Sequence, residues 1–216
     1  TAFYRLFLAA AILAPFCVFS ANYRAEIKNL RKSQWKQCLI AGALLAFHYL
    51  LWFESMNYTS VASSIVLVSL QPLFSLAIER FVSKKKIKST AIIGCFIALF
   101  GCVIIGAGDF QISGLSLLGD FIAFFAAGVI ALYFFIGETA RKEMSALSYS
   151  TLTYFFSAVI LFVCILIRNE SFTDYSGQTW FALVGIAVVS TIGGQFVFNL
   201  LLKHIPASAV TMSILG

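Results

Sequence analysis

The chain has 216 residues, of which 61% are hydrophobic and only 11% are charged, with a formal net charge of +6. Soluble domains average about 45–50% apolar and about 25% charged residues, so this composition excludes an ordinary soluble globular protein. The excess of apolar side chains requires lipid as a solvent, and we predict an integral membrane protein.

Apolar runs follow one another along the whole chain. Each full run is long enough for a helix that crosses a hydrocarbon core about 30 Å thick. The seven full runs cover residues 2–20, 37–57, 61–82, 89–107, 115–138, 147–168 and 179–202, and an eighth run begins at Pro206. The predicted fold class is therefore all-α: a polytopic transmembrane helical bundle with about seven complete spans and the start of an eighth.

Both ends of the chain lie within apolar runs, at Thr1 and at Gly216. We therefore expect the chain to be a piece of a longer protein. The first run contains one Arg and is preceded by no basic segment, which favours a membrane span over a secretory signal peptide.

Basic residues are concentrated in alternate loops. The loops after the first and third runs hold five Lys or Arg each, whereas residues 57–60 and 108–114 hold none. Of the 15 basic residues, 13 follow this alternation, with Arg5 and Arg168 as exceptions. The positive-inside rule assigns the basic loops to the cytoplasm. This topology explains the net charge, so we do not expect nucleic acid as a partner.

The chain repeats itself at an offset of 145 in the numbering. Trp35 matches Trp180, and the segment 61–65 matches the segment 206–210. In the predicted topology the two copies cross the membrane in opposite directions, so each repeat contains an odd number of helices and is inverted relative to the other. Inverted repeats are a common architecture of secondary transporters, with the substrate site between the repeats near the membrane midplane.

The stretch from His48 to Ser64, followed by Gln71-Pro72, resembles the EamA family of the drug/metabolite transporter (DMT) superfamily. The combination of Trp52-Phe-Glu-Ser with Gln71-Pro72 is the most specific part. The segment Lys203-His-Ile-Pro-Ala-Ser208 is similar to its counterpart in the second repeat.

The resemblance covers essentially the whole chain and implies a particular architecture. It implies ten helices in two inverted five-helix repeats, both termini in the cytoplasm and a central cavity. The seven full runs would be helices two to eight. Residues 1–107 would form a first repeat without its first helix, and residues 115–216 a second repeat that ends in its fourth helix.

Polar side chains inside the spans are the candidates for substrate binding. In the span at 37–57, helical spacing places Leu44, His48, Trp52 and Ser55 on one face, which suits a wall for a polar or aromatic solute. The alternative for His48 is a structural hydrogen bond to a neighbouring helix. With the family resemblance, we predict a cavity lined by His48, Trp52, Ser55, Gln71, Tyr133, Gln195 and Asn199.

Glu54 lies on a different face of the same span, about one turn from its outer end. A partly buried carboxyl group could bind a proton and couple it to transport, so Glu54 is the proton-coupling candidate. An interfacial carboxylate that reaches water is the equal alternative. Its match in the second repeat is Asn199, which cannot titrate.

Two places are candidate hinges. Pro72 lies mid-span, lacks a backbone N–H and releases the carbonyl of Val68, so we predict a kink. Gly193 and Gly194 allow close helix approach or local unwinding, beside a polar stripe of Thr191, Gln195 and Asn199. The alternatives are a static packing kink at Pro72 and amides that bridge helices structurally.

Other charged residues are predicted to be structural. Glu138 precedes Arg141 and Lys142 by three and four residues, which is typical of a surface ion pair. Glu79, beside Arg80, is interpreted in the same way. Asp120 lies about one turn inside the outer face, and the sequence indicates no role for it.

The repeat and the resemblance predict a secondary transporter that moves a small metabolite or drug-like solute by alternating access. Export, and location in the plasma membrane (in bacteria the inner membrane), are implied by the resemblance. Two alternatives stay open: a seven-helix receptor, and a membrane assembly subunit that does not transport.

The sequence contains no G-x-x-x-x-G-K-[ST] loop for ATP hydrolysis and no catalytic motif within the spans. We therefore do not expect the protein to be an enzyme. No pair of the five cysteines has metal-ligand spacing, and we expect neither a metal nor a cofactor. The expected partners are the lipid bilayer and a small solute, with the proton as candidate coupling ion. Amino acids, amines, sugars and xenobiotics fit the sequence equally well, and any oligomeric state is compatible with it.

Overall fold

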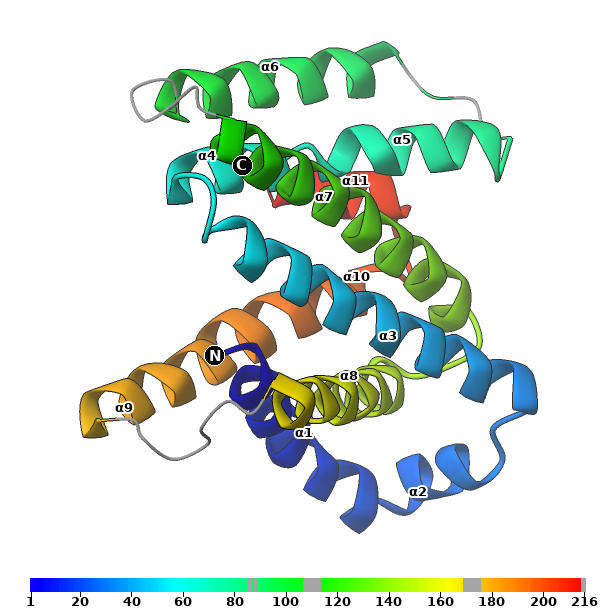
Figure 1. The fold of residues 1–216 in the computed structure, drawn as a ribbon. Coiled ribbons are helices and arrows are strands. Elements are labelled where there is room, and N and C mark those ends of the chain that lie inside the picture. Colours follow the sequence, from blue (N-terminus) through cyan, green and yellow to red (C-terminus); the bar gives the residue numbers. More distant parts are fainter. Residues whose placement is uncertain (85–86, 88, 107–113, 169–175, 215–216) are drawn as a thin grey trace. The chain divides into compact units, whose positions relative to one another are not determined.

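The computed structural model describes residues 1–84, 87, 89–106, 114–168 and 176–214, and these residues form helices and connecting turns without any strand. Figure 1 shows the helices and their labels. Their bounds are α1 Ala2–Phe19, α2 Ala21–Lys28, α3 Lys32–Ser55, α4 Val61–Val68, α5 Gln71–Phe81, α6 Ser89–Gly106, α7 Gly114–Arg141, α8 Ala146–Arg168, α9 Gly177–Gly185, η2 Ile186–Phe196, α10 Val197–Leu201 and α11 Ala207–Ser213.

Six helical segments in the described part of the chain are long and apolar enough to cross a membrane. They are Ala2–Phe19, Lys32–Ser55, Val61–Phe81, Gly114–Arg141, Ala146–Arg168 and Gly177–Leu201. The predicted all-α membrane bundle is thereby confirmed. Helix α6 coincides with the predicted run at 89–107, and α11 with the run that begins at Pro206. The total number of spans remains a prediction.

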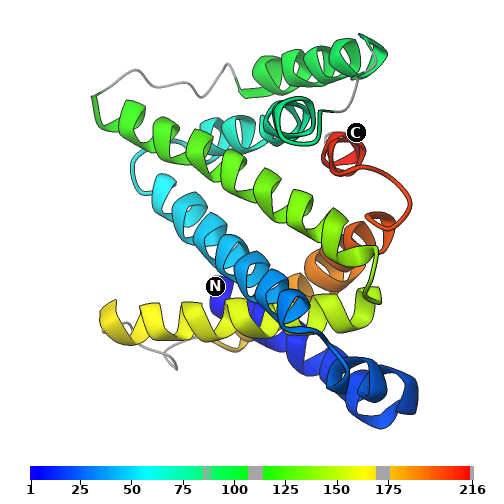
Figure 2. The same ribbon diagram turned by 90° about the vertical axis from the view of Figure 1, so that its right-hand side faces the viewer.

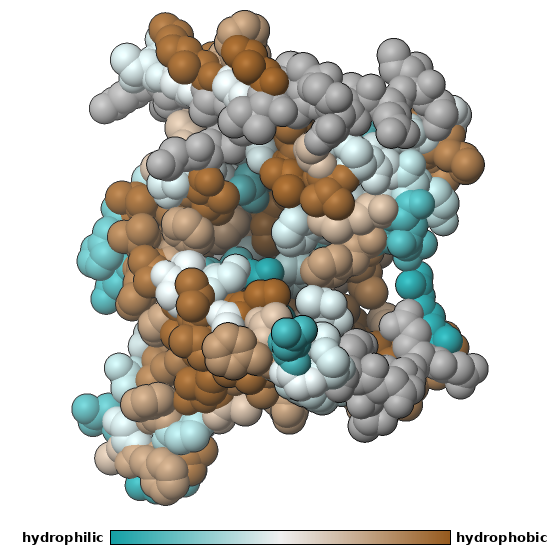
Figure 3. Space-filling model, turned by 90° about the vertical axis from the view of Figure 1, so that its left-hand side faces the viewer, coloured by the Kyte–Doolittle hydropathy of each residue, from teal (hydrophilic) through white to brown (hydrophobic). Residues whose placement is uncertain are grey.

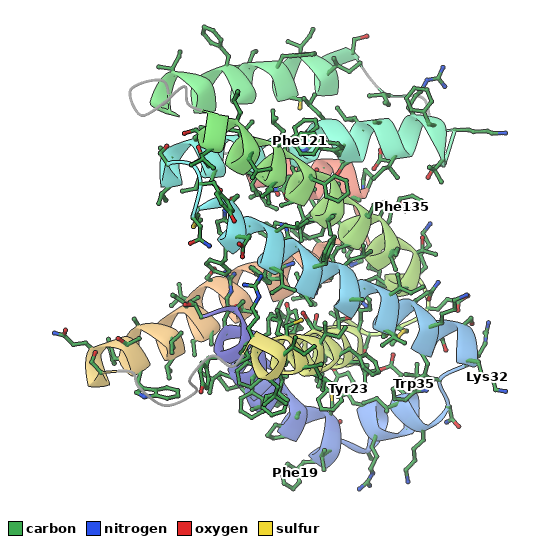
Figure 4. All side chains as sticks on the ribbon, viewed as in Figure 1. Phe19, Tyr23, Lys32, Trp35, Phe121 and Phe135 are labelled. Atoms are coloured by element: carbon green, nitrogen blue, oxygen red, sulfur yellow. The ribbon has the colours of Figure 1, made fainter. Side chains whose placement is uncertain are left out.

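Large apolar side chains lie on the surface of these helices. Phe19, Phe81 and Phe181 are 85%, 80% and 85% exposed. Figure 4 shows the Phe19 ring projecting away from the end of α1, and brown apolar side chains are prominent on the face drawn in Figure 3. Such a surface is unfavourable in water and favourable in lipid, as the composition predicted.

The chain forms two compact units, each assembled from two stretches of sequence. The first unit contains Thr1–Ala46 and Ile136–His204, and the second contains Phe47–Phe135 and Ile205–Gly216. Two of the three divisions fall within α3 and α7, so each of these helices contributes a part to both units, and the third falls between α10 and α11.

In the first unit α1 packs against α8 and η2, and Figure 1 shows α1 and α8 side by side. The contact face of α1 contains small side chains, since Ala9 and Ala10 are buried. In the second unit α5 packs against α11 and α4 against α6. Figure 2 shows α11, at the red end of the chain, beside α5.

Helix boundaries recur at the offset found in the sequence. Helix α1, shifted by this offset, falls on 147–164, which lies within α8. Helix α3 falls on 177–200, which coincides with the continuous segment from α9 to α10. Helix α4 falls on 206–213, which coincides with α11. The repeat is therefore visible in the order and length of the helices as well as in the residues.

Candidate functional site

The polar residues predicted to line a cavity divide between the two units. The second unit holds five of them: His48, Trp52, Ser55, Gln71 and Tyr133. The first unit holds Gln195 and Asn199.

His48 bridges two helices of the second unit. Its side chain is 5% exposed, and Nδ1 lies 3.0 Å from the backbone oxygen of Ala126 in α7. A carbonyl oxygen can only accept a hydrogen bond, so Nδ1 is the donor. This is the helix-bridging contact that the sequence left open as the alternative for His48.

The indole of Trp52 places a buried hydrogen-bond donor in the second unit. Its indole ring stacks on His48, with ring centroids 5.9 Å apart and planes at 26°. The indole Nε1 is buried and has no hydrogen-bond partner among the described residues. A buried unsatisfied donor costs about 1–3 kcal/mol, so an acceptor atom of a bound solute would be stabilised here.

Ser55 is held within the protein rather than presented to a solute. It is fully buried, donates to the backbone oxygen of Trp52 at 2.7 Å and lies 2.7 Å from the hydroxyl of Ser64. These contacts join the end of α3 to α4.

Gln71 and Tyr133 are both buried in the second unit. Gln71, at the start of α5, is 5% exposed, and Tyr133 in α7 is fully buried with an edge-on contact to Phe134 at 5.1 Å between ring centroids. One turn after Gln71, Ser75 has a buried hydroxyl without a hydrogen-bond partner among the described residues. Sequence reasoning missed Ser75, although its spacing of four from Gln71 places both on one face of α5.

Asp120 acquires a role in the structure. Its Oδ1 accepts hydrogen bonds from the hydroxyls of Thr59 at 2.7 Å and Ser63 at 2.8 Å. The neighbouring Gly119 permits this contact, because a Cβ there would lie 2.8 Å from the backbone nitrogen of Thr59 and 2.9 Å from the backbone oxygen of Ser55. The start of α7 is thus fastened to the turn between α3 and α4.

Glu79 is not the surface ion-pair partner that the sequence predicted. It is 5% exposed, and its two carboxylate oxygens accept from the backbone N–H of Ser208 at 3.0 Å and from the Ser208 hydroxyl at 2.9 Å. A carboxylate at the first turn of α11 satisfies an unpaired N–H and complements the helix dipole. The sequence could not indicate this contact, because Ser208 lies 129 residues from Glu79 along the chain.

Glu54, the proton-coupling candidate, is half-buried near the end of α3. The hydroxyl of Tyr58 lies 3.5 Å from its Oε1, at the limit of a hydrogen bond. This position is compatible with a carboxyl group that binds a proton and with an interfacial carboxylate that reaches water. The role of Glu54 in proton coupling stays a prediction.

In the first unit, two of the three residues of the predicted polar stripe, Thr191 and Gln195, lie in an 11-residue π-helix, η2, and Asn199 lies in α10. Thr191 is fully buried and accepts a hydrogen bond from Arg5 Nε at 2.7 Å, while Arg5 Nη2 donates to Ser190 Oγ at 2.8 Å. The amide nitrogen of Gln195 is buried without a hydrogen-bond partner among the described residues. Sequence reasoning noted Arg5 only as an exception to the charge pattern.

Helix α8 adds two further unsatisfied donors to the first unit. The hydroxyls of Thr153 and Ser157 are buried and have no hydrogen-bond partner in the described chain. Their spacing of four residues puts them on one face of α8. Neither residue was predicted, since a lone Ser or Thr in an apolar run carries no signal that distinguishes a lining residue from a packed one.

The side chain of Asn199 bridges two helices, which is the structural alternative predicted for the amides. It is fully buried, its Nδ2 donates to Ser150 Oγ at 2.9 Å, and its backbone oxygen accepts from Arg141 Nε at 2.7 Å. Arg141 also donates to the backbone oxygen of Met144. Arg141 and Glu138 are 4% and 8% exposed, so both residues are buried and do not lie at the surface as predicted.

Glu26 in α2 caps the start of α8. Its carboxylate accepts from the backbone N–H and the hydroxyl of Ser145, at 2.6 and 2.5 Å, and from the hydroxyl of Ser148 at 2.7 Å. Burial raises the pKa of Glu26, but these hydrogen bonds and the positive charge of Arg141 outweigh it and leave the pKa below its ordinary value. Nothing in the sequence indicated this contact.

The candidate hinges differ in their geometry. The helix is interrupted between Val68 and Gln71, so Pro72 lies in the first turn of α5, where its missing N–H is tolerated. At Gly194 an added Cβ would have no described atom within 4 Å, and at Gly193 only the backbone oxygen of Val188 at 3.6 Å. The two glycines therefore do not serve close helix approach among the described residues.

Within the described residues, no group of three or more His, Cys, Asp or Glu side chains is placed to hold a metal ion. The described parts of both units offer hydrogen-bond donors, aromatic faces and a guanidinium at the π-helix.

Comparison with known proteins gives a consistent result. The model of the EamA-like transporter family matches residues 1–107 and again residues 117–215. The chain is 27% identical over 218 residues to the protein named uncharacterized transporter YyaM of Bacillus subtilis, covering 98% of this chain and 70% of that protein. It is 25% identical over 186 residues to uncharacterized transporter YxxF of the same organism, covering 85% of this chain and 58% of that protein.

A solved crystal structure of a protein has the same fold. It superposes with a TM-score of 0.77 at 15% sequence identity, and the match covers 98% of this chain and 71% of that one. At this identity the likeness concerns the fold alone.

Proposed function

Since the chain belongs to the EamA-like transporter family and is a multi-pass membrane protein, we propose that it forms most of a secondary carrier in the plasma membrane. The carrier moves a small metabolite or drug-like solute outward by alternating access. Transport itself follows from the family, whereas the direction, the membrane and the mechanism are parts of the proposal.

The recurrence of helix boundaries between the two halves of the chain carries the proposal. With the basic loops in the cytoplasm, the two copies run in opposite directions through the membrane. Two inverted copies of one unit can exchange conformations, so that a site between them opens to one side and then to the other. The two matches of the family model, one in each half of the chain, support the division into repeats at 1–107 and 115–216.

Buried donors without a hydrogen-bond partner among the described residues are the candidate solute contacts in this proposal, taken within each unit by itself. Trp52 and Ser75 provide them in the second unit, and Thr153, Ser157 and Gln195 in the first. Polar groups at membrane depth are unfavourable unless protein, water or solute provides a partner. We place His48, Gln71 and Tyr133 near the solute path as positioning residues, with the interruption before Pro72 and the π-helix around Gly193 and Gly194 as the deformable segments.

Flux measurements on the full-length protein in proteoliposomes test the proposal. We expect time-dependent, saturable movement of at least one solute from a panel of amino acids, amines, sugars and dyes. An imposed pH gradient should alter this flux in the wild type and not in Glu54→Gln if the proton is the coupling ion. Absence of flux for the whole panel in both orientations would contradict the carrier, and an equal gradient response in Glu54→Gln would contradict the role of Glu54.

A further inference from the structure

Two contacts between a carboxylate and hydroxyl groups join distant segments of the second unit. Asp120 in α7 accepts hydrogen bonds from the hydroxyls of Thr59 and Ser63, at 2.7 and 2.8 Å. Glu79 in α5 accepts from the backbone N–H and the hydroxyl of Ser208, at 3.0 and 2.9 Å. All five residues belong to the second unit, so each contact is a property of that unit alone.

The charge pattern of the sequence assigns the two contacts to opposite faces of the membrane. The segments that meet at Asp120 border the two loops without Lys or Arg, which the positive-inside rule places outside. Glu79 borders a basic loop, and Ser208 follows Lys203 by five residues, which places both in the cytoplasmic half. Each contact therefore joins two segments that the topology assigns to the same face.

The two contacts also exchange the roles of the proposed repeats, residues 1–107 and 115–216. Ser63 and Ser208 occupy matching positions at the offset of 145. In the outer contact the serine belongs to the first repeat and Asp120 to the second. In the cytoplasmic contact the serine belongs to the second repeat and Glu79 to the first. Each contact thus fastens one repeat to the other at one face of the membrane.

Burial couples each contact to the closure of its face. Ser63, Ser208 and Glu79 are 1%, 6% and 5% exposed. A carboxylate that loses its donors while it stays buried is strongly destabilised, whereas a carboxylate that meets water is not. Each contact can therefore separate only when water reaches that face. In a carrier built from inverted repeats, the two faces open in turn.

We propose that these two contacts are the gates of the transport cycle. Asp120 with Thr59 and Ser63 forms the outer gate, and Glu79 with Ser208 forms the cytoplasmic gate. Each gate separates when the carrier opens to its side of the membrane. This inference rests on the proposed carrier function and adds the positioning residues that hold each side closed.

Labelling from each side of the membrane tests the gates without a known solute. All native cysteines of the full-length protein are replaced, and Ser75→Cys, at a position that is 1% exposed, provides the reporter. A membrane-impermeant thiol reagent is added to right-side-out or inside-out vesicles. Glu79→Gln should raise the labelling rate from the cytoplasmic side about tenfold or more, and Asp120→Asn should do so from the outer side.

Sidedness separates a gate from a contact that only stabilises the fold, because general loosening would raise labelling from both sides alike. Ser208→Ala and Ser63→Ala are the second pair of variants and replace any carboxylate variant that does not fold. The control is Ser176→Ala, since the exposed Ser176 hydroxyl accepts only a local bond from the N–H of Thr179 among the contacts described, at 3.3 Å. Labelling that is unchanged, equal from both sides or of the reverse sidedness in the gate variants would refute the proposal.

Reversible cross-links separate this inference from the proposed function. Paired cysteines replace Ser63 and Asp120, or Ser208 and Glu79, and flux in proteoliposomes is measured before and after reduction. A cross-linked gate should stop flux, and reduction should restore it. Flux that continues in the cross-linked protein would overturn the gates and leave the carrier intact. One-sided labelling in the gate variants, without flux of any solute, would support the gates and contradict the carrier.

Discussion

Ser63 and Ser208 occupy matching positions of the internal repeat, and each donates its hydroxyl to a carboxylate on another helix. Ser63 Oγ lies 2.8 Å from Asp120 Oδ1, and Ser208 Oγ lies 2.9 Å from Glu79 Oε2. Both pairs belong to the second unit. The serine at the start of α4 and of α11 is therefore common to both copies of the repeat, although its carboxylate partners are not related by the offset.

Removing either serine hydroxyl should destabilise the protein. Ser63→Ala and Ser208→Ala each delete a hydrogen bond to a carboxylate, and we expect losses of about 1.5–3 kcal/mol in the free energy of unfolding. Thermal unfolding of the purified variants checks this. Ser69→Ala is the matched control, because the exposed Ser69 hydroxyl donates to the backbone oxygen of Ile65 in the preceding turn, and its effect should be the smallest of the three.

Gly119→Ala should disturb the contact made by Asp120. The added methyl group would lie 2.8–2.9 Å from the backbone at Thr59 and Ser55, so α7 has to shift away from this turn. We expect a loss of about 1–3 kcal/mol in the free energy of unfolding, as for overpacking of a tight contact. Gly185→Ala, where an added Cβ meets no described atom within 4 Å, is the control and should be neutral or slightly stabilising. A tolerated Gly119→Ala would argue against the close approach.

Glu26 should make stability depend on acid pH. Its pKa in the folded protein lies below the ordinary value of 4.5, so its contribution is fully present above that value and is lost as the pH falls through the folded pKa. Glu26→Gln should therefore unfold about 1–2 kcal/mol more easily at neutral pH, an effect reduced by partial exposure, and should approach the wild type in acid.

Unfolding of wild type and Glu26→Gln measured across this pH range provides the test. Glu143→Gln is the control, since the ion pair between Glu143 and Arg31 is exposed, with a separation of 3.7 Å. We expect that variant to change stability little at any pH. A constant difference between wild type and Glu26→Gln at neutral and acid pH would contradict the role assigned to Glu26.

Arg141 should matter more to stability than its position next to a basic loop suggests. Its guanidinium satisfies the backbone oxygens of Asn199 and Met144, so Arg141→Ala leaves two buried acceptors without this donor. We expect a loss of about 2–4 kcal/mol, measured as reduced thermal stability and reduced yield of folded protein. The neighbouring exposed Lys142, changed to Ala, should have an effect within about 0.5 kcal/mol.

Trp52→Phe should raise the apparent KM for solute about three- to tenfold, because it retains an aromatic ring and deletes a buried N–H that has no hydrogen-bond partner among the described residues. Its control, Trp35→Phe, changes an indole near the start of α3 and should leave the KM unchanged. Proteoliposome flux measures both. An unchanged KM in Trp52→Phe would remove Trp52 from the solute site.

Hydrophobic length and charge distribution in the sequence predicted the helices. The span at 37–57 and its copy at 179–202 appear as α3 and as the segment from α9 to α10, because lipid requires about 20 apolar residues whatever the neighbours are. The interruption before Pro72 was equally predictable, since it follows from the missing N–H and the ring of proline itself. These properties depend on each segment alone.

The tertiary structure decided what the polar groups inside the helices do. Glu79 and Glu138 were predicted at the surface and are buried, and Arg5 gained its partners on η2. Sequence spacing describes only neighbours within one helix, whereas Ser208 lies 129 residues from Glu79 and Thr191 lies 186 residues from Arg5. A polar side chain at membrane depth takes whichever partner the packing of helices brings within hydrogen-bond distance, and that packing is a property of the folded bundle.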